Sequence, residues 1–148
     1  MSEKIAFIGA GNMARSLVGG LLTHGVPVDS IVASDPDASQ RNTIAALGIA
    51  TTASNSNAVQ GAATVVLAVK PQAMRTVVVD LHGALQSEQL LISIAAGVPI
   101  EAIQRWCNQR IGIVRCMPNT PALYGAGVTA LFANEFVTPQ QRADAQVT

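Results

Sequence analysis

A glycine-rich turn near the start of the chain has the residue types and spacing of a phosphate-binding motif. It consists of Gly9, Ala10, Gly11, Asn12, Met13 and Ala14. The turn follows an apolar run and precedes a segment with helical periodicity, which is the context that makes a G-x-G-x-x-A pattern informative. The first glycine permits a tight turn, the second lets a pyrophosphate approach the backbone, and the helix start offers N–H groups to the phosphates. We expect a dinucleotide-binding turn; the alternative is a turn that only connects strand and helix.

The end of the next apolar run supplies candidates for the adenosine end of a dinucleotide. This run ends at Ser34, and Asp35 and Pro36 follow it. Asp35 lies 21 positions after Ala14, near the spacing of an acid that binds the ribose 2′-hydroxyl of NAD. Ser34 or Arg41 would instead favour a 2′-phosphate, and Asp35 equally suits a cap for the next helix. The choice between NADPH and NADH stays open at this stage.

Further candidates follow three later apolar runs, because open α/β sheets bind ligands beyond the carboxyl ends of their strands. The Lys70-Pro71 pair equally suits a purely structural turn from strand to helix. Pro118 and Pro121 stiffen the last loop and hold Asn119 between them. The candidates at these corners are Ala68, Val69, Lys70, Pro71, Ala95, Ala96, Gly97 and Asn119.

Groups for acid–base, nucleophilic or metal chemistry are not evident in the sequence. His24 and His82 each fall near the end of a predicted helix, where a solvated histidine interacts favourably with the helix dipole. The sequence suggests no metal spacing, no carboxylate pair and no Ser-His-Asp or Cys-His set. Catalytic side chains therefore stay unassigned, and hydride transfer is favoured because a cofactor then carries the chemistry.

The predicted elements alternate between strands and helices. Five apolar runs resemble buried strands, at residues 4–8, 31–34, 64–69, 90–94 and 111–116. Most of them are continuously apolar, as parallel strands covered on both faces are. The pattern predicts an α/β fold with a doubly wound, mostly parallel Rossmann-type sheet and helices on both faces. Residues 127–133 add a strand at one end of that sheet.

The first predicted helix carries Met13, Leu17 and Leu21 on one apolar stripe. Gly19 and Gly20 lie in its middle, where we expect close packing against the sheet to compensate for their low helix propensity. The other helices carry Ile44 and Leu47 before Gly48, then Met74, Val77, Val78, Leu81 and Leu85, and then Ile103 and Cys107 after Pro99. The valine-rich third helix would pass for a strand by propensity alone.

The composition predicts one folded domain. The 148 residues carry no net charge and are 49% hydrophobic and 12% charged, which favours neither nucleic acid nor a membrane as a partner. Cys107 and Cys116 fit two reduced, buried thiols, and Glu3 and Arg15 argue against a signal peptide. The longest apolar stretch, 62–69, is too short to span a membrane. These features indicate a cytoplasmic protein.

Four segments resemble the pyrroline-5-carboxylate reductase family. They are FIGAGNMA at 7–14, AVKPQ at 68–72, SIAAGV at 93–98 and VRCMPNTPALYGAG at 114–127. The resemblance implies reduction of 1-pyrroline-5-carboxylate to L-proline, in proline biosynthesis, with NADPH or NADH. It places Gly9 to Met13 on the pyrophosphate, Ser34, Pro36 and Asn55 on the adenosine end, and Ala68 to Pro71, Ala95 to Gly97 and Asn119 on the nicotinamide end. Asp35 departs from members that favour NADPH.

The resemblance also implies a second domain, which forms the homo-oligomer and binds the substrate carboxylate. We expect 1–148 to be the NAD(P)-binding domain, with the Thr138-Pro139-x-Gln141 helix start at 138–148 leading to a domain that this chain lacks. The isolated chain is then expected to bind dinucleotide and to turn over little substrate. Two alternatives remain: another Rossmann oxidoreductase such as a 3-hydroxyacid dehydrogenase, which would lack the MPNTP loop, or a non-catalytic dinucleotide-binding or interaction module.

Overall fold

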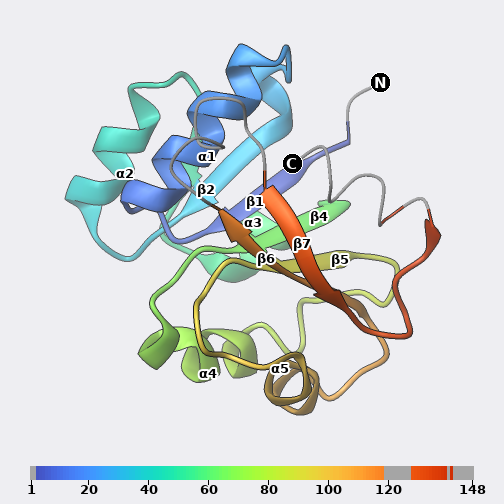
Figure 1. Ribbon diagram of the computed structural model, residues 1–148. Helices are drawn as coiled ribbons and strands as arrows, with labels where there is room; N and C mark the ends of the chain where they lie inside the picture. The colour runs from blue at the N-terminus through green and yellow to red at the C-terminus, as the bar shows by residue number, and fades with distance from the viewer. Residues whose placement is uncertain (1–2, 119–127, 140, 142–148) are drawn as a thin grey trace.

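The computed structural model describes residues 3–118, 128–139 and 141 (Figure 1). The strands are β1 (Ile5–Ile8), β2 (Ile31–Ser34), β3 (Ala50–Thr52), β4 (Thr64–Leu67), β5 (Leu90–Ser93), β6 (Gly112–Pro118) and β7 (Val128–Ala133). The helices are α1 (Asn12–Thr23), α2 (Ala38–Ala45), α3 (Asn55–Val59), α4 (Pro71–Asp80) and α5 (Ile100–Cys107), with a short 3-10 helix, η1 (Val28–Ser30).

All of these strands form one sheet in the order β3-β2-β1-β4-β5-β6-β7. The first six strands are parallel, and β7 pairs antiparallel with β6 at the edge. The chain winds outward from β1 to β3, then returns to β4 on the other side of β1 and winds outward again. The doubly wound Rossmann-type sheet and the extra strand at one end of it are therefore confirmed.

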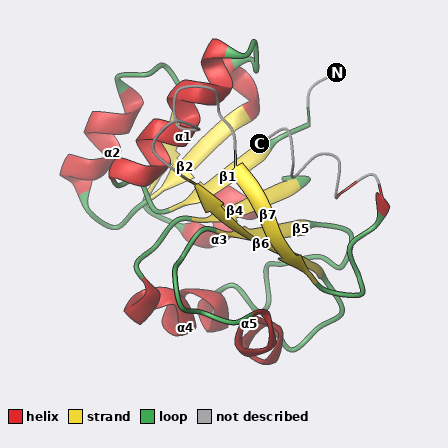
Figure 2. Ribbon diagram, in the orientation of Figure 1, coloured by secondary structure: helices red, strands yellow, loops and turns green. Residues whose placement is uncertain are grey.

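Helices cover both faces of the sheet, α1 and α2 on one and α3, α4 and α5 on the other (Figure 2). The parallel strands β1, β2, β4, β5 and β6 supply residues to both cores, because successive side chains point to opposite faces. In β1, Phe7 packs with the core under α1 and α2, whereas Ala6 and Ile8 pack with the core on the other face. This two-sided burial explains why the strands read as continuously apolar runs.

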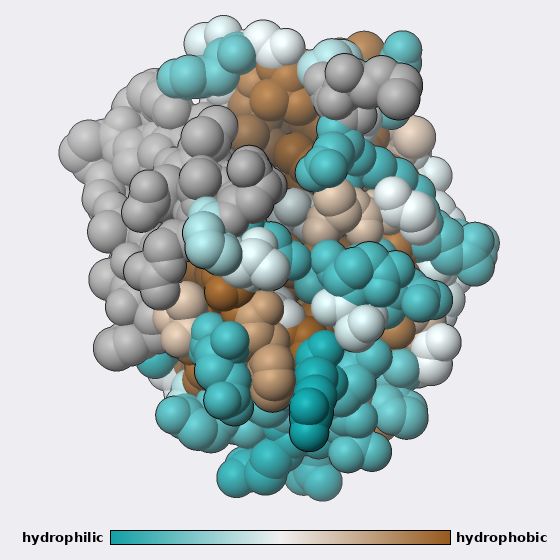
Figure 3. Space-filling model, turned by 90° about the vertical axis from the view of Figure 1, so that its right-hand side faces the viewer, coloured by the Kyte–Doolittle hydropathy of each residue, from teal (hydrophilic) through white to brown (hydrophobic). Residues whose placement is uncertain are grey.

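One face of the molecule carries mainly hydrophilic residues, with hydrophobic ones in patches between them (Figure 3). Among the described residues, no helix combines the length and the hydropathy that crossing a membrane requires.

Two short elements were missed by the sequence analysis, strand β3 and helix α3. In β3, Ala50 is exposed and Thr51 and Thr52 are half-buried, so the strand has no apolar run. Helix α3 has only five residues, which is too short for a periodic pattern. Its N-cap is Ser54, whose hydroxyl accepts a hydrogen bond from the Asn57 N–H at 3.2 Å. Strand β3 extends the sheet beyond β2, and α3 lies in the connection from β3 to β4.

Two helical predictions need correction. The predicted third helix is a helix, but α4 ends at Asp80, and Leu81 and Leu85 are buried in the turns that follow. In α1, Leu17 and Leu21 are buried as expected, whereas Met13 is 39% exposed. In the first turn of α1 it is the neighbouring Ala14, and not Met13, that is buried in the core against the sheet.

The predicted helix ends are only partly confirmed, because α2 ends at Ala45 and leaves Leu47, which is 37% exposed, outside the helix. Asp37, not Asp35, caps α2, and its carboxylate accepts from the N–H and hydroxyl of Ser39 at 2.9 Å. This pairing lowers the pKa of Asp37. Gly48 follows α2 with φ of +98°. Thr138 and Gln141 form a reciprocal capping box, in which each side chain accepts from the other residue's backbone N–H.

Close packing at Gly19 was wrongly expected. No heavy atom of the described residues outside its own helix lies within 4 Å of the position that a Cβ would take. We expect Gly19→Ala to raise the free energy of unfolding by about 0.5–1 kcal/mol, because alanine has the higher helix propensity. Thermal unfolding should show a melting temperature roughly 2–4 °C higher. Gly25→Ala is the control: that site is equally open but has φ of +93°, so alanine should destabilise it.

The two cysteines are free and buried, as expected. Burial raises the pKa of Cys107 to about 12 and that of Cys116 to about 11. We therefore expect both thiols to react far more slowly with a thiol reagent at pH 8 than in a denatured control, because the thiolate is the reacting species. Mass-resolved labelling measures each site. Rapid labelling of either cysteine in the folded protein would contradict this burial.

Candidate functional site

The predicted binding residues meet at one edge of the sheet because the strand register aligns the corners that carry them. Ile8 lies opposite both Ser34 and Leu67, and Leu67 lies opposite Ser93. The turns after β1, β2, β4 and β5 therefore start from one row across the sheet. Between β1 and β4 the winding reverses direction, which is where open α/β sheets bind ligands.

The first glycine of the motif fits tightly between β1 and β4. Gly9 has φ of +104°, and its N–H donates to the Ser34 carbonyl at 2.8 Å. A Cβ at this position would lie 2.6 Å from the Ala68 carbonyl oxygen and 2.9 Å from its carbon. These are backbone atoms of the neighbouring strand end, which cannot move aside independently. Both the conformation and the packing therefore require glycine.

The second glycine faces open space. Gly11 is the N-cap of α1, it has no side chain to cap the helix, and no heavy atom of the described residues lies within 4 Å of a built Cβ. The N–H groups of the first turn of α1 thus point toward a site that a phosphate can approach. The residues present fit the pyrophosphate of a dinucleotide, and contact of Gly11 with that group stays a prediction.

Asp35 connects the glycine turn to the turn after β2. Its Oδ2 accepts from the Ala10 N–H at 2.9 Å, and its Oδ1 accepts from the Asp37 N–H at 2.9 Å. The carboxylate therefore lies beside the glycine turn, at the adenosine end of the predicted site. The alternative that Asp35 caps the next helix is wrong, because Asp37 holds that position.

Two arginines bond to the glycine turn and to the turn after β2. Arg41 reaches back, as the sequence suggested, and its Nη1 donates to the carbonyls of Asp35 at 2.7 Å and Pro36 at 3.1 Å. Arg15 was missed. Its guanidinium donates to the Ala10 carbonyl at 2.9 Å, to Gln40 Oε1 at 2.6 Å and to Asn12 Oδ1. Its position one turn into α1 was the available signal, since that turn faces the glycine loop and α2.

Ser34 and Asn55 lie together at this end. Ser34 is fully buried, and its hydroxyl donates to Asn55 Oδ1 at 2.6 Å. Asn55 is the first residue of α3 and is half-buried. Ser34 thus holds the side chain of Asn55 in place, and contact of Ser34 and Pro36 with the cofactor stays a prediction.

The corners assigned to the nicotinamide end follow β4 and β5. Lys70 is exposed and extended as the N-cap of α4, with Pro71 at the first helical position. The Ala95 N–H donates to Ser93 Oγ at 3.4 Å, and Gly97 has φ of +76°. Asn119 lies outside the described residues. The structure therefore brings the other predicted residues to one edge without testing their contacts.

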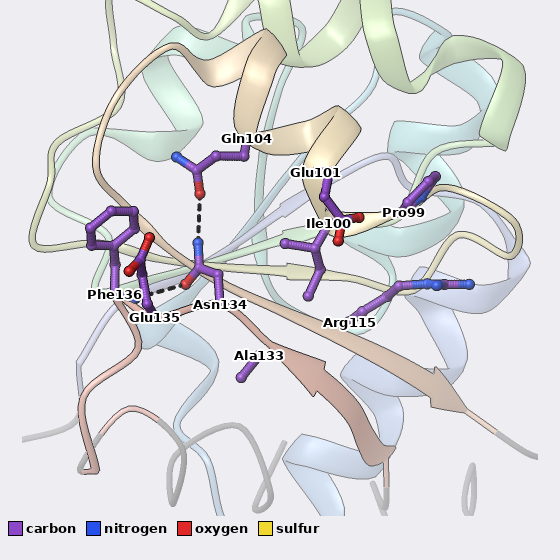
Figure 4. Close-up of a pocket in the computed structure, with 9 residues that line it drawn as sticks. All are labelled: Pro99, Ile100, Glu101, Gln104, Arg115, Ala133, Asn134, Glu135 and Phe136. Atoms are coloured by element: carbon purple, nitrogen blue, oxygen red, sulfur yellow. Dashed lines mark hydrogen bonds between the residues drawn. The ribbon is translucent and has the colours of Figure 1, made fainter.

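A separate cavity of about 390 Å³ lies between α5 and the β6–β7 edge (Figure 4). Asn134 is one of the residues that line it, and its amide donates to Gln104 Oε1 at 2.6 Å and to the Ile111 carbonyl at 2.8 Å. Its Oδ1 accepts from the Ile113 N–H at 3.0 Å. The described lining shares no residue with the four corners. Sequence reasoning missed this cavity because its walls come from three separate segments.

Comparison with known proteins gives consistent matches. The family model described as NADP oxidoreductase, coenzyme F420-dependent, matches residues 4–97. The pyrroline-5-carboxylate reductase of Pseudomonas aeruginosa is 53% identical over 141 residues, which are 95% of this chain and 52% of that protein. The chain thus spans about half the length of the curated relatives it matches.

Two solved structures have the same fold over nearly the whole chain. The pyrroline-5-carboxylate reductase of Coxiella burnetii gives a TM-score of 0.90 at 36% identity, covering 98% of this chain and 54% of that one. The pyrroline carboxylate reductase of Plasmodium falciparum, with NADP bound, gives 0.84 at 26% identity and covers 99% and 55%.

We expect Gly9→Ala to destabilise the protein strongly, because the new methyl group meets the Ala68 carbonyl and alanine disfavours positive φ. A loss of about 2–4 kcal/mol in the free energy of unfolding is the expected scale. Chemical denaturation measures it, with Gly11→Ala as the matched control, since that glycine lies in open space at φ of −80°. Equal stabilities of the two variants would contradict the packing described at Gly9.

Proposed function

Because the chain belongs to the pyrroline-5-carboxylate reductase family and corresponds to its N-terminal NAD(P)-binding domain, we propose that it binds NADPH or NADH for the reduction of 1-pyrroline-5-carboxylate to L-proline. The observation that carries this proposal is the helix start at Gly11, which is open and lacks a side-chain cap. A relative whose structure contains NADP supports the same ligand class.

We assign the residues at this edge of the sheet to three parts of the dinucleotide. The glycine turn from Gly9 to Met13 binds the pyrophosphate through backbone N–H groups, which explains why a chain without net charge suffices. The adenosine end takes Ser34, Asp35, Pro36 and Asn55. The nicotinamide end takes Ala68, Val69, Lys70, Pro71, Ala95, Ala96, Gly97 and Asn119.

The chemistry requires positioning more than acid–base catalysis by this chain. When bound, the reduced nicotinamide supplies a hydride to the carbon of the C=N bond, whose protonated nitrogen becomes the amine of L-proline. A protonated imine is already electrophilic, so holding the reactants close and aligned supplies much of the rate. The small residues Ala95, Ala96 and Gly97 leave room for that approach beside the strand ends.

The rest of the enzyme is also part of the proposal. The relatives are about twice as long as this chain, and we assign binding of the substrate carboxylate and formation of a homo-oligomer to the half that it does not match. The enzyme would act in the cytoplasm. This division predicts dinucleotide binding by the chain with little or no substrate turnover.

Titration of NADPH and NADH against thermal stability tests the proposal. A ligand at 100 times its dissociation constant adds about 2.7 kcal/mol to the free energy of unfolding, so the melting temperature should rise with concentration. Gly11→Ala should keep the fold and lose most of that rise, because its methyl group occupies the phosphate site. Gly19→Ala, the same change further along α1, should respond like the unmodified chain.

Three outcomes would count against the proposal. No rise in melting temperature with either dinucleotide would show that the chain does not bind them. If the melting temperature of Gly11→Ala rises as much as that of the unmodified chain, the phosphates do not bind at the start of α1. Proline formation from 1-pyrroline-5-carboxylate at a normal enzymatic rate would contradict the division of labour between the two halves.

A further inference from the structure

The cavity between α5 and the β6–β7 edge has a wall that hydrogen bonds hold in place. The Asn134 amide donates to Gln104 on α5 and to the Ile111 carbonyl. Its Oδ1 accepts from the N–H groups of Ile113 at 3.0 Å and Phe136 at 3.2 Å. These bonds join α5, β6 and the turn after β7. The wall is therefore preorganised, and the volume of about 390 Å³ is typical of a small-molecule site.

Opposite charges lie at one end of this cavity. Glu101, in the first turn of α5, and Arg115, on β6, are both at the end nearest Pro99 (Figure 4). The planar fork of an arginine matches a carboxylate, and a glutamate pairs with an ammonium group. A free amino acid carries both of these groups on its α-carbon. This end of the cavity therefore matches the part that all α-amino acids share.

The other end of the cavity favours a cation. Glu135, which is exposed, and Phe136, which is half-buried, lie there beside Asn134 and Gln104 (Figure 4). The amides of Asn134 and Gln104 are bonded to one another, so Glu135 supplies the charge at this end. A guanidinium or ammonium group pairs with a carboxylate and also lies favourably against the face of an aromatic ring.

Apolar side chains separate the two charged ends. Ile100 and Ala133, both half-buried, lie between them (Figure 4). The methylene stem of a long basic side chain packs on such a surface while its charged tip reaches a polar group. The described lining has two glutamates and one arginine, so it has a net negative charge. A basic amino acid neutralises that charge, whereas an acidic one would place a second carboxylate beside Glu135.

We propose that this cavity binds a basic α-amino acid. The α-carboxylate binds Arg115, the α-ammonium group binds Glu101, and the cationic tip of the side chain binds Glu135 against the Phe136 ring. No residue of the described lining belongs to the four corners of the proposed dinucleotide site. The amino-acid site is therefore a second site, and it does not depend on dinucleotide binding.

An NMR titration of the chain with L-arginine tests this site, with the side-chain amide signals of Gln104 and Asn134 as the local readout. We expect both signals to shift, with a dissociation constant of about 1 mM or below. Agmatine, which lacks the carboxylate, and L-leucine, which lacks the cationic tip, should each bind at least about tenfold more weakly. L-Glutamate, whose tip has the opposite charge, should bind more weakly than L-leucine.

Variants assign the contacts. Glu135→Gln should weaken L-arginine by roughly tenfold and leave L-leucine unchanged, because only the cationic tip reaches this carboxylate. Glu101→Gln should weaken both amino acids, since both carry the α-ammonium group. Glu88→Gln is the matched control: it makes the same change at an exposed glutamate outside the cavity, so the affinity for L-arginine should change less than about twofold.

Four results would overturn the site. The first is no shift of the Gln104 and Asn134 signals at about 10 mM L-arginine. The second is a set of shifts confined to the glycine turn, which would place the ligand in the dinucleotide site. The third is equal weakening by Glu135→Gln and Glu88→Gln, because general electrostatics would then explain the binding. The fourth is equally tight binding of N-acetyl-L-argininamide, whose ends are both blocked, which would assign the cavity to a basic protein segment.

Discussion

The close contact between the backbones of β1 and β4 at Gly9 is the constraint on which the site depends. The Ala68 carbonyl lies where any Cβ at Gly9 would be, so the two strand ends approach as closely as backbone allows. The Ala68 N–H donates to the Ile8 carbonyl at 2.8 Å and holds that approach. The winding of the sheet reverses between these two strands, and α1 begins three residues after Gly9, at Asn12.

Side chains then hold the neighbouring turns to this one. Asp35 bonds to the Ala10 N–H, Arg15 bonds to the Ala10 carbonyl, and Arg41 bonds to the carbonyls after β2. Both polar groups of the Ala10 peptide region are therefore satisfied by residues from outside the phosphate site. In the proposed function, these hydrogen bonds preorganise the loop before α1 for phosphate binding at the first turn of the helix.

Much of the fold and the position of the site followed from local sequence features. The buried strands were predictable because a strand covered on both faces is apolar at most successive positions. The glycine motif was predictable because a tight turn before a helix has a fixed spacing. Strand β3 was not, since pairing with β2, not burial, holds its three residues. The open space around Gly19 was not predictable from the sequence either. Helix periodicity indicates which side of a helix faces the sheet, but it does not give the distance between them.

The sequence by itself determined the family, the alternation of strands and helices, and the edge of the sheet where a dinucleotide would bind. Only the tertiary structure decided what the charged residues at that edge do. Asp35 and Ala10 are 25 positions apart, and so are Arg15 and Gln40. Spacing left the function of Asp35 undecided between ribose recognition and helix capping. The register of β1 against β2 brings these residues within hydrogen-bonding distance, and register depends on packing across the whole sheet.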